Sequence, residues 1–192
     1  MFGDLHIHMI LDGVYYRAAI DAQKEHPLDG LVRARLSDYQ ARGVCLLRDG
    51  GDAWGVSLRA RELAGEYGID YRSPAFPIYR RGHYGAFIGR GFDTEDEYRA
   101  LLDEAGEKRA DFIKLMISGL IDFDHFGVLT EPGPEPQDIR RMIELAHAAG
   151  FAVMAHANGD RAVTAALQAG VDSIEHGAKL DDDLICLFRE RG

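Results

Sequence analysis

Short apolar runs alternate strictly with helical patterns along this chain of 192 residues. Six runs have the character of buried strands: 5–9, 44–48, 69–77, 112–118, 151–157 and 173–176. Six helical patterns follow them in turn: 31–42, 54–67, 95–110, 135–149, 160–169 and 181–191. The runs are almost continuously hydrophobic, which is typical of a parallel sheet covered by helices. The alternation therefore predicts an α/β fold of six βα units.

Two architectures fit six βα units: an open doubly wound sheet, and part of a TIM-type (β/α)8 barrel. The polar candidates described below stand at or near the carboxyl ends of the runs, and a barrel gathers all these ends at one mouth. In an open sheet, the first and sixth strands would lie far apart. The first run is not followed by Gly-x-Gly-x-x-Gly, and Gly89-Arg90-Gly91 is only a glycine pair. We therefore expect an incomplete barrel that forms a single domain over residues 1–192.

Composition and charge exclude several classes of protein. Hydrophobic residues make up 46% of the chain and charged residues 28%, which indicates a globular domain. The net charge of −10 argues against broad contact with nucleic acid or with an anionic membrane. The two cysteines, Cys45 and Cys186, do not suggest a disulfide framework. Since no targeting signal and no apolar run of about 18 residues is visible, we expect a cytoplasmic protein.

Two histidines stand near the start of the chain, in the sequence Asp4-Leu5-His6-Ile7-His8. Alternate residues of a strand point to the same face, so His6 and His8 would direct two imidazole rings at one point. Asp4 would lie one step deeper on that face, where it could orient a ligand. Two histidines are costly in a hydrophobic interior because their ring nitrogens need partners. The pattern therefore favours a metal site over a pair of core histidines.

The fourth run contains a lysine, Lys114. Strand alternation places Lys114 on one face with Phe112 and Met116, while the residues between them face the helices. A buried lysine with a lowered pKa can capture carbon dioxide as a carbamate, which is an anionic ligand with two oxygens. A lysine that extends along the strand end toward solvent is the alternative. Position alone does not decide between these two interpretations.

His156 and His176 end the fifth and sixth runs. Each of them alone would more often be a core or loop residue, but together with His6 and His8 they predict a set of metal ligands. The remaining histidines fall in loop-like segments or within a helical pattern and are not assigned as ligands: His26, His83, His125 and His147.

Polar and aromatic residues that follow the third and fifth runs are candidates for contact with a substrate. They are Arg80, Arg81, Tyr84, Arg90 and Arg161. Among them, Tyr84, Arg90 and Arg161 are the substrate-binding candidates, because an arginine can hold a carboxylate with two hydrogen bonds. A solvated charge in a loop is the alternative for each arginine.

The arrangement of these residues is similar to that of the amidohydrolase superfamily. The strings Asp-Phe-Ile-Lys-Leu-Met-Ile-Ser-Gly, Ala-His-Ala-Asn-Gly-Asp-Arg-Ala-Val and Gly-Val-Asp-Ser-Ile-Glu-His-Gly resemble its branch of prolidase-type dipeptidases and imidazolonepropionase-like hydrolases. The resemblance spans nearly the whole chain. It implies that His6 and His8 bind one metal ion and that His156 and His176 bind a second. A carboxylated Lys114 would bridge the two.

The resemblance also implies a chemistry. Lys114 and His176 would belong to the catalytic set, and the cofactors would be two divalent metal ions, with zinc as the default. The implied reaction is hydrolysis of an amide, peptide or cyclic amide bond by a metal-activated hydroxide, and the implied substrate is a small-molecule amide or a dipeptide. The alternatives are a phosphotriesterase- or lactonase-like hydrolase, and a catalytically inactive remnant or metal-binding oligomerisation module.

Two departures from the family pattern change what we expect of this chain alone. The family has a catalytic aspartate at the end of strand eight, whereas Asp181, Asp182 and Asp183 open the last helical pattern. A complete barrel usually needs about 250 residues, so strands seven and eight are expected to be missing. A first strand at residue 5 also leaves no room for an N-terminal β-sandwich. We therefore expect poor turnover or none, and a homo-oligomer that covers the open strand edges.

Overall fold

Two parallel sheets form the framework of the molecule in a computed structural model, which describes residues 2–125 and 127–191. The first sheet has the order β1-β2-β3, with β1 at Phe2–Ile7, β2 at Val44–Asp49 and β3 at Asp70–Arg72. The second has the order β5-β4-β6-β7-β8. Its strands are β4 (Pro77–Arg80), β5 (Arg90–Phe92), β6 (Ile113–Met116), β7 (Val153–Ala157) and β8 (Ser173–His176). Each paired strand runs parallel to its neighbour.

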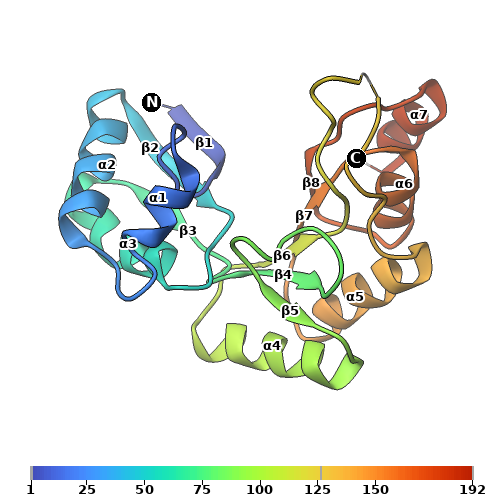
Figure 1. Ribbon diagram of the computed structural model, residues 1–192, viewed down its shortest axis with the longest axis horizontal. Helices are drawn as coiled ribbons and strands as arrows, with labels where there is room; N and C mark the ends of the chain where they lie inside the picture. Colours follow the sequence, from blue (N-terminus) through green and yellow to red (C-terminus); the bar gives the residue numbers. More distant parts are fainter. Residues whose placement is uncertain (1, 126, 192) are drawn as a thin grey trace.

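The helices cover the outer faces of these sheets, as Figure 1 shows. The first sheet and the helices near it form one side of the ribbon, and the last two strands with their helices form the other. The two sides are joined through β4, β6 and α4. The helices are α1 (Tyr16–Asp21), α2 (Asp29–Ala41), α3 (Val56–Ala64) with the 3₁₀ turn η1 (Gly65–Tyr67), α4 (Glu95–Glu107), α5 (Pro136–Ala148), α6 (Asp160–Gln168) and α7 (Asp182–Arg191).

This arrangement confirms the α/β class and the incomplete barrel. The strands follow one another around the wall in chain order, apart from the outlying β5. Within the described residues, β1 pairs only with β2 and β8 pairs only with β7, so one edge of each of these strands is free. None of the helices in that part of the chain is long and apolar enough to cross a membrane.

The run 69–77, predicted as one strand, is two strands that belong to different sheets. β3 pairs with β2, whereas β4 pairs with β6 and β5. Between them, Pro74 has no amide hydrogen to donate, and Ala75 has a φ of +67°, which a strand does not permit. The prediction of a single strand was therefore wrong. The short elements α1 and β5 were not predicted at all.

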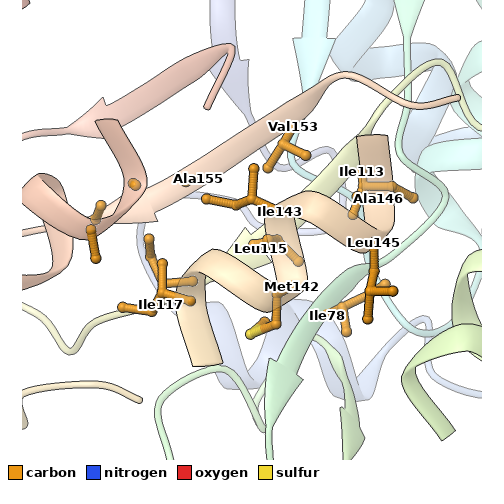
Figure 2. Close-up of a cluster of buried hydrophobic side chains, with 14 of the residues drawn as sticks. Ile78, Ile113, Leu115, Ile117, Met142, Ile143, Leu145, Ala146, Val153 and Ala155 are labelled. Atoms are coloured by element: carbon orange, nitrogen blue, oxygen red, sulfur yellow. The ribbon is translucent and has the colours of Figure 1, made fainter. Parts of the chain in front are cut away.

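Side chains on β6 alternate between the helices and the interior of the half-barrel, as predicted. Ile113, Leu115 and Ile117 are fully buried among hydrophobic residues of α5 and β7, and Figure 2 shows this cluster. Burying an isoleucine or leucine side chain contributes about 1.5–3 kcal/mol. The cluster therefore holds α5 against the outer face of the sheet. It leaves Lys114 on the opposite face, where the candidate site forms.

Glycines in the left-handed conformation follow several helices. Gly43, Gly68, Gly150 and Gly170 have φ values of +76°, +65°, +87° and +77°. A residue with a Cβ is strained in this conformation, so each glycine allows a sharp turn from a helix toward the next strand.

Candidate functional site

The five predicted metal ligands gather on the inner side of the half-barrel. His6 lies on β1 and His8 directly follows that strand, while Lys114 comes from β6, His156 from β7 and His176 from β8. The four imidazole rings form a connected series. The ring centroids of His6 and His8 are 5.4 Å apart, those of His6 and His176 are 5.0 Å apart, and those of His176 and His156 are 4.7 Å apart.

Lys114 lies at the centre of this cluster and has no exposed surface. Its Nζ is 3.3 Å from Nε2 of His6. Burial lowers the pKa of Lys114 to about 7, although the nearby carboxylates of Glu175 and Asp49 act in the opposite direction. A large fraction of the amine is therefore neutral at pH 7. A neutral amine is a nucleophile, which a protonated lysine is not.

Backbone carbonyl groups fix the rings of His8 and His156. Nδ1 of His8 lies 3.0 Å from the carbonyl oxygen of Gly51, and Nε2 of His156 lies 3.1 Å from that of Gly119. A carbonyl oxygen only accepts, so each of these nitrogens carries a hydrogen and the other ring nitrogen has a free lone pair. Burial lowers the pKa of each ring to about 3, so both are neutral at pH 7. A neutral imidazole with a free lone pair is the form that binds a metal ion.

His176 occupies the last position of β8 with a φ of +71°. Histidine is found in this left-handed region more often than most residues, but the conformation is still strained. Strained backbone positions cluster at functional sites. Here the turn at His176 places its ring between those of His6 and His156.

Glu175 is a member of the site that the sequence analysis missed. It is only 8% exposed, and its Oε2 accepts from Nδ1 of His6 at 3.1 Å. Its other carboxylate oxygen forms an ion pair with Arg48, which also donates from Nε to the carbonyl oxygen of Leu5 at 2.8 Å. Burial acts to raise the pKa of Glu175, but the hydrogen bond from His6 and the charges of Lys114 and Arg48 outweigh it and lower the pKa.

These contacts differ from what was expected of Asp4. Asp4 accepts a hydrogen bond from the backbone N–H of His6 at 3.3 Å, whereas the imidazole of His6 is oriented by Glu175. The available signal in the sequence was a glutamate within a four-residue strand next to His176, because a carboxylate in such a strand needs a partner. The sequence did not identify that partner, since Arg48 and Glu175 are 127 residues apart.

Asn158 is a second residue that was missed, and it joins the ends of three strands. It is 3% exposed, and its side chain donates to the carbonyl oxygen of Gly119 at 3.2 Å and accepts from the amide of Ala178 at 3.1 Å. Its own amide donates to Oγ of Ser118 at 2.8 Å. These bonds fix the loop whose carbonyl group holds His156.

The spacing of the histidine rings suits one metal ion for each of two histidine pairs. Because zinc–nitrogen bonds are about 2.1 Å long, two imidazoles that share one ion have centroids about 5 Å apart. The spacings of 5.4 Å for His6 with His8, and of 4.7 Å for His156 with His176, agree with this value. Among the residues that the structure describes, no three His, Cys, Asp or Glu side chains are grouped closely enough to hold one ion. Lys114 is the additional side chain within reach of the cluster, with its Nζ 3.3 Å from Nε2 of His6.

The substrate-binding candidates divide between the site and the periphery. The ring of Tyr84 lies 5.0 Å from that of His156, centroid to centroid. Arg90 instead forms an ion pair with Glu104 on α4, and Nη2 of Arg161 is 2.7 Å from Oε1 of Glu135, at the start of α5. The structure thus brings Tyr84 to the cluster and does not bring the two arginines to it.

A cavity of about 790 Å³ adjoins the cluster at β1. His6, His8 and His176 are among its lining residues. Polar residues of α2 and of the position that follows it also line the cavity, namely Arg35, Asp38, Tyr39 and Arg42. His6, His8 and His176 are therefore accessible to small molecules and ions from this cavity.

Solved structures share this architecture. The crystal structure of ochratoxinase from Aspergillus niger matches 99% of this chain with a TM-score of 0.75 and 19% identity, and the match covers 50% of that chain. A Xaa-Pro dipeptidase with bound methionine matches 99% of this chain with a TM-score of 0.71 and 20% identity, and the match covers 51% of that chain. At these identities the likeness shows the fold.

Comparison of sequences adds the family. Ochratoxinase of Aspergillus niger is 27% identical over 154 residues, which are 78% of this chain and 30% of that protein. An uncharacterized protein of Mycobacterium tuberculosis is 43% identical over 54 residues, 28% of this chain and 15% of that protein. The chain thus spans less than a third of the length of these curated relatives. The sequence profile described as the amidohydrolase family matches residues 58–192. On this evidence, the chain belongs to the amidohydrolase family.

Proposed function

We propose that this chain carries the metal centre of a hydrolase that cleaves C–N bonds in amides, peptides or cyclic amides. The observation that carries the proposal is the gathering of four histidines around one fully buried lysine, from strands that lie on both sides of the half-barrel. The names of two neighbours agree with this reaction class, because a Xaa-Pro dipeptidase and a phenylurea hydrolase both cleave C–N bonds.

His6 and His8 would hold one divalent ion, and His156 and His176 would hold the other. The spacing of each pair supports this division. Zinc suits a site of imidazole nitrogens and carboxylate-like oxygens. Such ions lower the pKa of a bound water and polarise a carbonyl group, which is the chemistry that they would supply here.

Lys114 would contribute as a carbamate between the two pairs. Its neutral amine attacks carbon dioxide, a bond forms between Nζ and carbon, and one proton is released to solvent. The product carries one negative charge on two oxygens, so the site gains an anionic ligand where it had an amine. The pKa of about 7 supports this role, because it makes the reactive neutral amine abundant at neutral pH.

The other residues of the site would orient these ligands and the substrate. Glu175 holds the hydrogen of His6 on Nδ1, and the carbonyl groups of Gly51 and Gly119 do the same for their histidines. Burial raises the pKa of Tyr84 to about 12, so its hydroxyl stays protonated at pH 7. Tyr84 would therefore form a wall of the substrate site that can donate a hydrogen bond.

Metal binding is the first test of the proposal. The 192-residue chain, purified without chelator and loaded with zinc and bicarbonate, should retain up to two equivalents of metal by elemental analysis. The variants His156→Asn and Lys114→Met should retain less, whereas His26→Asn, in an exposed turn before α2, should match the wild type. Less than a tenth of an equivalent in the loaded wild type would overturn the proposal.

Hydrolysis is the second test. Loaded protein should be assayed on dipeptides, N-acyl amino acids and anilides, with a phosphotriester and a lactone in parallel. Cleavage of the C–N substrates that is lost in His156→Asn supports the proposal. Preference for the phosphotriester or lactone would assign the other hydrolase class. Bound metal without turnover on any substrate, even in a longer chain that supplies the remaining strands, would favour a metal-binding module.

A further inference from the structure

The last residue of β2 and the turn that follows it form the sequence Asp49-Gly50-Gly51-Asp52, which lies against the ring of His8. Both aspartates are buried, with exposures of 0% for Asp49 and 2% for Asp52. Two buried carboxylates within four residues need a specific reason, because each loses its hydration on folding. The reason differs between them. Asp52 caps α3 by accepting from the amides of Val56 at 3.1 Å and Ser57 at 2.6 Å, whereas Asp49 is bound to the surroundings of His8.

The two glycines of the turn form the surface on which the imidazole of His8 packs. A Cβ at Gly50 would lie 2.4 Å from Cε1 of His8 and 2.7 Å from its Nε2, so only glycine allows the ring to occupy this place. Gly51 has a φ of +82°, and its carbonyl oxygen is the partner of Nδ1 of His8. The ring is therefore in contact with the backbone of the turn on one face and bound to it at one nitrogen.

Asp49 ties this surface to the strand that carries the ring. Oδ1 of Asp49 accepts from the amide of Gly51 at 2.6 Å, and Oδ2 accepts from the amide of Met9 at 3.1 Å. Met9 directly follows His8, so one carboxylate holds the backbone on both sides of the imidazole. The hydroxyl of Tyr71 also donates to Oδ2 and fixes the carboxylate from β3.

We propose that Asp49, Gly50 and Gly51 form a brace that holds His8 in the tautomer with its hydrogen on Nδ1 and its lone pair on Nε2. Asp49 is then a positioning residue, because it binds the amides of Gly51 and Met9 rather than an ion, and Gly51 in turn presents its carbonyl oxygen to the ring. The inference rests on the proposed function in one respect, namely that Nε2 of His8 is a metal ligand. The tautomer itself does not depend on that assignment.

The change Asp49→Asn distinguishes a role of the hydrogen bonds of Asp49 from a role of its side-chain volume. Asparagine has nearly the same shape, but one of its two ends is an NH₂ group that cannot accept a hydrogen bond. The amide of Gly51 or that of Met9 would then face a donor, and the turn would lose one of its two attachments. The carbonyl group of Gly51 would no longer be fixed, and both tautomers of His8 would be populated.

The ring nitrogens can be observed directly in the metal-free full chain by NMR with ¹⁵N-labelled histidine. The wild type should show His8 with the hydrogen on Nδ1, and Asp49→Asn should show a mixture of tautomers. Zinc affinity, measured by competition with a chelator, should fall by about 10–100-fold, as is usual when a residue that orients a ligand is lost. The matched control is Asp52→Asn, which removes an equally buried carboxylate of the same turn and should leave the tautomer of His8 unchanged.

A second variant covers the case in which Asp49→Asn does not fold. Gly50→Ala keeps the carboxylate and adds one methyl group against the imidazole, so it should displace the ring and weaken zinc binding while the helices remain. A single Nδ1–H tautomer in folded Asp49→Asn, or wild-type zinc affinity in Gly50→Ala, would overturn the brace. Failure of the wild type to bind zinc would overturn the proposed function instead, and the tautomers would still decide the brace.

Discussion

Lys114 is a charged residue type in a position without any exposed surface. Its ammonium form would be stabilised by Glu175, but burial outweighs this attraction and lowers its pKa to about 7. In the metal-free fold, the amine of Lys114 is therefore fully buried and only partly protonated at pH 7. Such a position lowers stability, and strongly shifted pKa values of this kind cluster at functional sites.

Replacement of this lysine by an apolar residue of similar length should stabilise the metal-free protein. We expect Lys114→Met to raise the free energy of unfolding by about 2 kcal/mol, because it removes the desolvation of an amine from a fully buried position. The same change should reduce zinc retention, since it removes the proposed carbamate. Urea denaturation in EDTA measures the first effect, with the half-exposed Lys24→Met as control. An unchanged or lower stability would show that the amine is well accommodated.

The candidate ligands were predictable from sequence, whereas the residues that orient them were not. His6, Lys114 and His156 lie within strongly apolar runs or near their ends, and the periodicity of a strand is enough to assign their faces. Glu175 and Asp49 acquire their roles from chain segments far from them in sequence. Their partners depend on how strands cross the interior, which hydrophobic periodicity does not encode.

At the scale of elements, the first and last strands are linked across the interior by a single carboxylate. Glu175 on β8 binds His6 on β1 and Arg48 on β2, and it lies close to the charge of Lys114. Within the described residues, β1 and β8 form no backbone ladder with each other. The side chain of Glu175 therefore connects β8 to β1 and β2, which backbone hydrogen bonds would do in a closed barrel.

Loss of this carboxylate should loosen β1. We expect Glu175→Gln to lower the free energy of unfolding by about 3 kcal/mol, because it leaves partly buried Arg48 without its counter-charge. Hydrogen exchange of the β1 amides should become faster than that of β6. The exposed ion pair of Glu62 with Arg59 supplies the control, since Glu62→Gln should cost less than about 1 kcal/mol. Equal effects of the two substitutions would contradict the link.

The turn after β2 should give the protein a specific dependence on pH. Burial raises the pKa of Asp49 from 3.8 to about 6, so the folded state holds this proton more tightly than the unfolded chain. The resulting stabilisation is fully present below pH 3.8 and is lost as the pH rises through 6. The wild type should therefore lose on the order of 1 kcal/mol relative to Asp49→Asn between pH 5 and pH 7.5. Urea denaturation of both metal-free proteins measures this difference, and a constant gap would contradict it.

Helices and strands with long apolar patterns were predicted within a few residues, whereas the short elements were not. The six residues of α1 lie in a polar segment, and β5 has only three residues. Neither is long enough to show a period. The division of run 69–77 between β3 and β4 depends on the turn at Ala75, and its positive φ is imposed by the two sheets rather than by its own preference.

At the scale of the whole molecule, the free edges of β1 and β8 are surfaces on which a second chain could bind. Large apolar side chains are exposed on β1, with 68% exposure for Phe2 and 54% for Leu5. Unpaired strand edges with apolar side chains are templates for another chain. We therefore predict a homo-oligomer that covers these surfaces.

Sedimentation equilibrium at micromolar concentration tests this prediction. The wild type should be larger than a monomer, and Leu5→Asp should shift the distribution toward monomer by placing a charge in the covered surface. Val128→Asp is the control, because Val128 is also exposed, at 49%, but lies in the loop between β6 and α5. A stable wild-type monomer would contradict the prediction.

The buried hydrophobic residues form two separate cores, one built around β1, β2 and β3 and the other around β4, β6 and β7. His6 and His8 belong to the first side of the molecule, and His156 and His176 belong to the second. A carbamate at Lys114 with an ion on each side would act as a cross-link between two folding units. Its strength would depend on the concentrations of free metal and carbon dioxide, because binding to the folded state alone stabilises it by mass action. The supply of these two small solutes would then set whether the two halves unfold together or one at a time.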